Sequence, residues 1–248
     1  METIINGLKI NYRIFGEGKP FLILHGWGSN SLRWQSAGEL ISQYGYRVII
    51  PDLPGFGESE SLSEPWDTDN YADFAEKFIS YFDLKDFYLL GHSFGGAIAV
   101  KISIKHAQDI KKLFLVSAAL IRKKTAKKNF FSKAAKVAKL FRFLPHYGLI
   151  RKAVYKFIIR KSDYAYVEGV MKKTYLNIIS EDLSLRLPFI KTPVLIIWGN
   201  KDEATPVEQC YFIHEQIKNS KLELVMDAGH DLNVKKPELL VEAILQNI

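Results

Sequence analysis

A serine with a glycine two residues before it and another two residues after it, at the end of a short apolar run, is the feature that most constrains the fold of this chain. The run 87–90 is wholly apolar, which is typical of a strand covered on both faces of a sheet. It leads into Gly91-His92-Ser93-Phe94-Gly95-Gly96. Because glycine has no Cβ, the backbone can turn sharply there and pack closely against its neighbours. The pattern predicts a tight strand-to-helix turn that presents the Ser93 hydroxyl at the end of a sheet.

Two further polar side chains follow predicted strands later in the chain. Asp202 comes after the apolar run 193–198, and His230 comes after the run 222–226. A serine hydroxyl is a weak nucleophile that needs an adjacent base, and imidazole suits that task near neutral pH. We therefore predict that Ser93 is a nucleophile and that His230 is its general base and later its acid. Asp202 is expected to hold the histidine tautomer and to stabilise the imidazolium that forms.

These motifs resemble those of the α/β-hydrolase superfamily, and the resemblance covers nearly the whole chain. It is carried by His25-Gly26-Trp27-Gly28, by 52–59 (Asp-Leu-Pro-Gly-Phe-Gly-Glu-Ser), by the turn at Ser93, by Trp198-Gly199-Asn200-Lys201-Asp202 and by Ala228-Gly229-His230. The chain order Ser, Asp, His is the one that this superfamily uses. The resemblance implies a capped, esterase-like serine hydrolase. It also implies an oxyanion hole formed by the backbone N–H groups of Trp27 and Phe94.

Short apolar runs alternate with amphipathic segments, which predicts an α/β fold with a mainly parallel, doubly wound sheet. Strands are predicted at 8–15, 21–24, 47–50, 87–90, 113–116, 193–198 and 222–226, and helices at 71–82, 96–106 and 207–212. The alternation stops between Val116 and Val194, where helical patterns cover 127–144, 149–160 and 166–179. We expect a helical cap at 120–187, inserted in a core made of residues 1–119 and 188–248.

A substrate pocket is expected between this core and the cap. The side chains of Trp27 and Phe94 are predicted to line it from the core, and Phe141 and His146 from the cap. Aromatic side chains supply the apolar walls that such pockets usually have. The chain carries no phosphate-binding loop and no Cys/His cluster, so we expect neither a cofactor nor a metal.

The apolar runs, the N-terminal pattern and the cysteine content of the sequence indicate the cellular compartment in which the protein is expected. The sequence has no apolar run of the length that a membrane-spanning helix needs, and its N-terminus lacks the pattern of a signal peptide. The one cysteine, Cys210, excludes an internal disulfide. A cytoplasmic protein is therefore the default expectation.

The charge of the chain is unevenly distributed. Residues 122–173 contain sixteen basic and two acidic residues, a net charge of +14, whereas the rest of the chain has a net charge of −7. This basic insert could merely be solvated, contact an anionic membrane surface, capture an acidic carrier protein, or bind an anionic small substrate through one or two arginines. The motifs at 25–28 and 52–57 are also similar to those of carrier-protein methyl esterases of biotin synthesis. No nucleic-acid-binding motif accompanies the charge, so nucleic acid is not an expected partner.

We predict hydrolysis of a carboxylic ester with a short to medium acyl chain, through an acyl-enzyme on Ser93. Three alternatives use the same side chains: hydrolysis of a carbon–carbon bond in vinylogous diketones, cofactor-free perhydrolysis, and a ligand-binding receptor that turns over slowly. Haloalkane dehalogenases and epoxide hydrolases share the implied fold but need an aspartate at the position of Ser93, so both are set aside.

Overall fold

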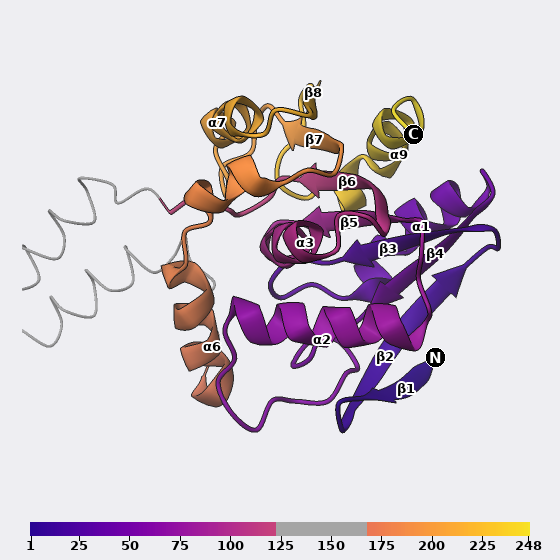
Figure 1. The fold of residues 1–248 in the computed structure, drawn as a ribbon, viewed down its shortest axis with the longest axis vertical. Coiled ribbons are helices and arrows are strands. Elements are labelled where there is room, and N and C mark those ends of the chain that lie inside the picture. The colour runs from indigo at the N-terminus through magenta and orange to yellow at the C-terminus, as the bar shows by residue number, and fades with distance from the viewer. Residues whose placement is uncertain (123–167) are drawn as a thin grey trace, which may run out of the picture.

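The computed structural model describes residues 1–122 and 168–248 of the chain. The described residues form one eight-stranded sheet with the order β1-β2-β4-β3-β5-β6-β7-β8 (Figure 1). The strands are β1 (Glu2–Ile5), β2 (Leu8–Phe15), β3 (Lys19–Leu24), β4 (Tyr46–Pro51), β5 (Phe87–His92), β6 (Ile110–Val116), β7 (Val194–Gly199) and β8 (Ser220–Val225). β2 pairs antiparallel with β1 and β4, and every other pairing is parallel. The predicted mainly parallel sheet is confirmed.

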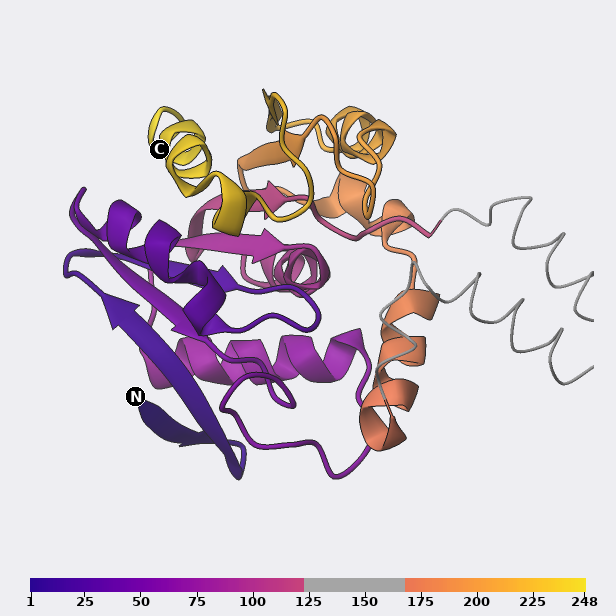
Figure 2. The ribbon, with the colours of Figure 1, turned by 180° about the vertical axis from the view of Figure 1, so that it is seen from behind.

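Helices cover both faces of this sheet (Figure 2). They are α1 (Gln35–Ser42), α2 (Thr68–Tyr81), α3 (Phe94–Lys105), α6 (Gly169–Ser180), α7 (Glu208–Gln216), α8 (Leu232–Lys235) and α9 (Pro237–Leu245), with 3₁₀ helices η1 (Ser31–Trp34) and η3 (Ser184–Phe189). Buried side chains of α2, α3 and α7 belong to one apolar cluster, and those of α1 and α9 belong to another. The sheet therefore separates two cores, as expected of a doubly wound fold.

Strand β3 shows why its apolar run is unbroken. Successive side chains of a strand point to opposite faces of the sheet. Leu22 and Leu24 pack into the cluster under α2 and α3, whereas Phe21 and Ile23 pack into the cluster under α1 and α9. All four side chains have no solvent-exposed surface. A central strand between two helical layers leaves no position for a polar residue, so the polar side chains of the site come after the strands.

The order of the strands places a crevice at the ends of β3 and β5. From β3 the chain passes through α1 to β4 on one side, and then through α2 to β5 on the other side of β3. In open α/β sheets, ligands bind at the carboxyl ends of the strands where the order reverses in this way. The loop after β3 and the turn after β5, which carries Ser93, lie at this point.

The region between β6 and β7 contains α6 and η3, and no strand among its described residues. The helical pattern predicted at 166–179 corresponds to α6, which is joined to the core because Thr174 Oγ1 accepts a hydrogen bond of 3.0 Å from Trp66 N. The two chain segments that enter and leave this region meet where Leu183 N donates to Leu120 O at 2.9 Å. The predicted cap helices at 127–144 and 149–160 lie outside the described residues.

Candidate active site

Ser93 occupies a strained backbone conformation between β5 and α3. Its φ of 51° and ψ of −115° lie outside the regions that side-chain-bearing residues normally adopt, at a cost of about 1–3 kcal/mol. Three main-chain hydrogen bonds hold it there. Ser93 N donates to Val116 O at 3.0 Å, and Ser93 O accepts from Gly96 N at 3.0 Å and from Ala119 N at 2.9 Å. The end of β6, the residues after it and the first turn of α3 thus fix the backbone conformation of Ser93.

Two glycines allow the chain to pack closely around this turn. A Cβ on Gly95 would lie 2.1 Å from the backbone oxygen of Leu24, so only glycine lets α3 begin against the end of β3. A Cβ on Gly26 would lie 3.1 Å from the Cβ of Ser93. The loop after β3 therefore lies directly against the serine.

Two backbone N–H groups beside Ser93 are candidate hydrogen-bond donors to an anion. Phe94 is the first residue of α3, and the first N–H groups of an α-helix have no partner within the helix. The second candidate donor is Trp27 N. His25 Nε2 accepts a hydrogen bond of 2.9 Å from Leu53 N, so its proton is on Nδ1, which donates to Gly26 O at 2.8 Å. Since the N–H of a trans peptide points opposite to its C=O, this bond fixes the direction of the Trp27 N–H.

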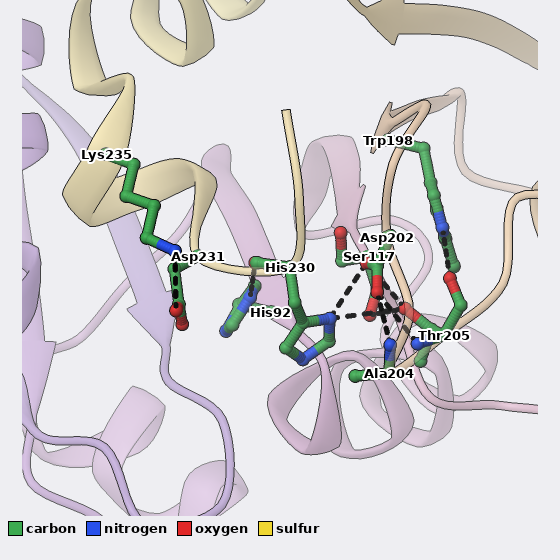
Figure 3. Close-up of polar contacts among 9 residues, drawn as sticks. All are labelled: His92, Ser117, Trp198, Asp202, Ala204, Thr205, His230, Asp231 and Lys235. Atoms are coloured by element: carbon green, nitrogen blue, oxygen red, sulfur yellow. Dashed lines mark hydrogen bonds and ion pairs between the residues drawn. The ribbon is translucent and has the colours of Figure 1, made fainter. Parts of the chain in front are cut away.

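Asp202 and His230, in the loops that follow β7 and β8, are joined by a hydrogen bond (Figure 3). His230 Nδ1 lies 2.8 Å from Asp202 Oδ2, and the side chain of Asp202 has no solvent exposure. A carboxylate only accepts, so His230 carries its proton on Nδ1 and keeps a lone pair on Nε2. This is the tautomer that a general base for a hydroxyl requires.

The loop after β7 holds Asp202 in its ionised form. Asp202 Oδ1 accepts hydrogen bonds from Ala204 N at 2.9 Å and Thr205 N at 2.8 Å, and Oδ2 accepts from Thr205 Oγ1 at 2.9 Å. Burial by itself would raise the pKa of Asp202. The hydrogen bond and charge of His230, together with the N–H of Thr205, outweigh that effect and keep the pKa below its ordinary value.

Thr205 is a residue of this site that the sequence patterns did not indicate. Besides Asp202, its Oγ1 lies 3.3 Å from His230 Nδ1 and 3.2 Å from Ser117 O (Figure 3). The hydroxyl thus contacts Asp202, His230 and the main chain that follows β6. Its spacing of three residues from Asp202 is typical of a turn in which a carboxylate accepts later N–H groups, and that was the available signal.

Replacing Thr205 by Val is expected to lower kcat for an ester substrate about tenfold, because a hydrogen bond to a charged group is lost. The isosteric side chain keeps the Thr205 N–H and the shape of the turn. Thr205→Ser keeps the hydroxyl and should retain most of the activity. Steady-state kinetics of the three proteins, with melting temperatures as a folding check, test this. Equal kcat values for Thr205→Val and wild type would contradict it.

His92, the residue before Ser93, holds the main chain of His230. His92 Nε2 lies 3.1 Å from His230 O, so it carries the proton and donates, and the two rings are 5.0 Å apart. Burial, and next the charge of His230, lower the pKa of His92 to about 4. Burial also lowers the pKa of His25 to about 4. Both side chains are therefore neutral structural groups near neutral pH.

The neutral state of these two histidines predicts acid sensitivity of the fold. Between pH 6.5 and about 4 the unfolded chain binds more protons at His25 than the native chain does, so the free energy of unfolding falls as the pH falls. At about 1.4 kcal/mol per pKa unit, the loss reaches about 3 kcal/mol for that residue, and His92 adds a loss of the same sign. Urea unfolding across this pH range should show a smaller loss for His25→Gln than for wild type. Parallel curves would contradict the assignment.

Ser93, His230 and the Asp202 loop border one cavity of about 790 Å³. Trp27 and Phe94 line it, and Tyr175 of α6 packs its ring 5.1 Å from that of Trp27. Other side chains that line the cavity are mostly polar or charged, with two isoleucines: Ser29, Arg33, Arg122, Ile178, Ile179, Glu203 and Asn233. Two residues predicted to contact substrate, Phe141 and His146, lie outside the described residues.

The acidic neighbour of the base does not compete with Asp202. Asp231 turns toward two cations, with Arg33 at 3.8 Å and Lys235 at 3.9 Å (Figure 3 shows the second pair). Across residues 1–122 and 168–248, no three potential metal-ligating side chains come together. In the same ranges, no helix has the length and apolar character needed to cross a bilayer.

Known proteins resemble this chain in sequence and in fold. Residues 19–237 match the family described as the alpha/beta hydrolase fold. The AB hydrolase superfamily protein YisY of Bacillus subtilis is 28% identical, over 93% of this chain and 92% of its own length. Lipase 1 of Psychrobacter immobilis is 28% identical, over 92% of this chain and 77% of its own. The esterase EaEST of Exiguobacterium antarcticum superimposes with a TM-score of 0.78 at 26% identity, covering 99% and 98% of the two chains.

Proposed function

Because this chain belongs to the alpha/beta hydrolase fold family, we propose that it is a serine hydrolase that cleaves carboxylic esters with short to medium acyl chains. The similar proteins named lipase and esterase support ester cleavage. The observation that carries the proposal is the 2.8 Å bond between His230 and the fully buried Asp202, at the wall of the cavity that Ser93 borders.

In the proposed reaction Ser93 Oγ attacks the ester carbonyl carbon while His230 Nε2 takes the hydroxyl proton. The carbonyl oxygen becomes negatively charged and accepts hydrogen bonds from the N–H groups of Phe94 and Trp27. Collapse of this intermediate breaks the bond to the alcohol oxygen, which takes the proton from His230. Water then attacks the acyl-enzyme with the same base, and the free acid leaves.

Asp202 supports each proton transfer through electrostatics. Its ionised carboxylate stabilises the imidazolium that forms when His230 accepts a proton, and its hydrogen bond keeps the ring from turning. Four hydrogen bonds and complete burial leave the carboxylate no other orientation. His92 holds the main chain of the same histidine, so the base is constrained from both sides.

A series of p-nitrophenyl esters tests this proposal. Acetate, butyrate and hexanoate esters should each release many equivalents of p-nitrophenol per protein, and the palmitate ester should be a poor substrate. Activity should persist in a chelator. Release that stops near one equivalent would favour the receptor alternative. Absence of ester turnover with cleavage of a vinylogous diketone would favour carbon–carbon bond hydrolysis, and either outcome would reject the proposal.

A further inference from the structure

Arg122 reaches the candidate active site from the segment that follows β6. Ala119 N donates to Ser93 O at 2.9 Å, and both Ala119 and Arg122 line the cavity that contains Ser93. Three residues of extended chain span at most roughly 10 Å, and the hydrogen bond of Ala119 adds 2.9 Å, so Arg122 begins within about 13 Å of the serine main chain. Its side chain is therefore within reach of the far end of a small ester bound at Ser93.

The guanidinium of Arg122 forms no salt bridge with a carboxylate among the described residues. Its Nε is buried without a hydrogen-bond partner, and Nη2 makes one long contact of 3.5 Å with Ile178 O. Asp182 and Glu181 act on this charge only through space. Asp182 accepts hydrogen bonds from the main-chain N–H groups of Arg122 and Ser184, and Glu181 pairs with Lys101 at 2.5 Å. Burial lowers the pKa of the guanidinium, which nevertheless stays charged at neutral pH.

A half-buried guanidinium that donates no hydrogen bond to a carboxylate is a binding group for an anion. Arginine presents parallel N–H donors that match a carboxylate, and partial desolvation makes such a pair stronger than it would be in water. Tyr175, which packs on Trp27 and lines the same cavity, is an electrostatic neighbour of Arg122.

The acidic residues at the cavity wall do not cancel this charge. Asp231 is neutralised by Arg33 and Lys235. Glu203 is exposed to solvent, and water screens an exposed charge more strongly than one that is half buried. The wall beside Arg122 is completed by the apolar side chains of Ile178 and Ile179. A ligand with a short apolar chain ending in an anion matches this surface.

We propose that Arg122 selects esters that carry a carboxylate a short chain away from the reacting carbonyl. This inference rests on the proposed ester hydrolysis at Ser93 and specifies its substrate class. The carboxylate can belong to the acyl part, as in a half-ester of a dicarboxylic acid, or to the alcohol part. In both cases the anion pairs with the Arg122 guanidinium while the ester carbonyl lies at Ser93.

Matched pairs of esters test the proposal on the whole chain. Monoethyl adipate is compared with ethyl hexanoate for a carboxylate on the acyl side, and 4-carboxybutyl acetate with pentyl acetate for one on the alcohol side. In wild type, kcat/KM should favour the anionic member of at least one pair, and added salt should reduce that preference. Arg122→Gln should lower the ratio of anionic to neutral kcat/KM by about 10- to 100-fold.

Three further variants make the result specific. Arg122→Met keeps the apolar stem if Gln is poorly tolerated and should lose the preference equally. Arg122→Lys keeps the charge and should retain part of it. Arg186→Gln removes the same charge from an exposed position of η3 that does not line the cavity, and its ratio should match that of wild type.

The outcomes separate this inference from the proposed function. Ser93-dependent hydrolysis with an anionic-to-neutral ratio that neither Arg122→Gln nor Arg122→Met changes would overturn the role of Arg122 and leave ester hydrolysis intact. If wild type hydrolyses none of the four matched esters and none of the p-nitrophenyl esters, both the proposed ester hydrolysis and the proposed substrate class are overturned.

Discussion

Ser93→Ala is expected to lower kcat for p-nitrophenyl butyrate by roughly 10⁵-fold, because removing the nucleophile of a serine hydrolase disables the whole catalytic group. The strained turn is held by main-chain bonds to Val116, Gly96 and Ala119, none of which involves the hydroxyl. The variant should therefore fold normally and bind esters without acylation. Initial rates and circular dichroism of the purified protein measure both properties.

Ser29→Ala is the matched control for this substitution. Ser29 lies in the loop after β3 and lines the same cavity, so the variant also removes one hydroxyl from the cavity wall. Its kcat should stay within a few-fold of that of wild type, since the hydroxyl of a partly exposed loop serine contributes little to stability and Ser29 has no role in the proposed reaction. Comparable activity of Ser93→Ala and Ser29→Ala would place the nucleophile elsewhere.

Asp202→Asn is expected to lower kcat by roughly 10⁴-fold, the loss typical when the orienting carboxylate of such a triad becomes an amide. The amide nitrogen would face His230 Nδ1 or the N–H groups of Ala204 and Thr205, which are all donors. The histidine would then favour the tautomer with its proton on Nε2, which cannot accept a proton from Ser93. Steady-state rates across neutral pH measure this loss.

Asp231→Asn removes the same charge one residue from the base and serves as its control. Asp231 faces Arg33 and Lys235 rather than the ring of His230, so its loss should change kcat by no more than a few-fold. Equal losses for Asp202→Asn and Asp231→Asn would mean that general charge near His230, rather than the specific hydrogen bond, matters for activity.

The candidate catalytic residues that can be predicted from the sequence are those that closely follow a predicted strand. An unbroken apolar run marks a central strand, and the polar or glycine-rich residues that follow it must lie at the carboxyl edge of the sheet. This is why the regions of Ser93, Asp202 and His230 could be assigned from spacing. The same reasoning predicted the strands β2 and β5 from their first residues, Leu8 and Phe87.

Elements whose formation depends on tertiary contacts were missed. The strand β1 has only four residues, and the Asn6-Gly7 turn was its signal, with φ of 54° and 79° at the two central positions as in a tight hairpin. Helix α1 was not predicted, although its residues Ala37 and Ile41 are fully buried. The spacing of Thr205 from Asp202 indicates a turn but not the contact with His230, because that contact comes from two loops that meet in space.

The predictions about the partners of the basic insert concern residues that lie mostly outside the described part of the chain. Its charge is concentrated in 122–173, and of these residues only Arg122 and 168–173 are described. Contact with an anionic membrane or an acidic carrier protein stays a prediction from composition. Arg122 is the one basic residue of the insert that lines the cavity among those described, which is why it carries the substrate proposal.

Covalent labelling tests the central claim most directly. The protein is treated with a fluorophosphonate, digested and analysed by mass spectrometry while residual ester hydrolysis is followed. The triad account predicts one adduct, on the peptide that contains Ser93, with loss of activity in proportion to labelling and no adduct in Ser93→Ala. Labelling at another residue that tracks the loss of activity, or undiminished labelling of Ser93→Ala, would contradict it.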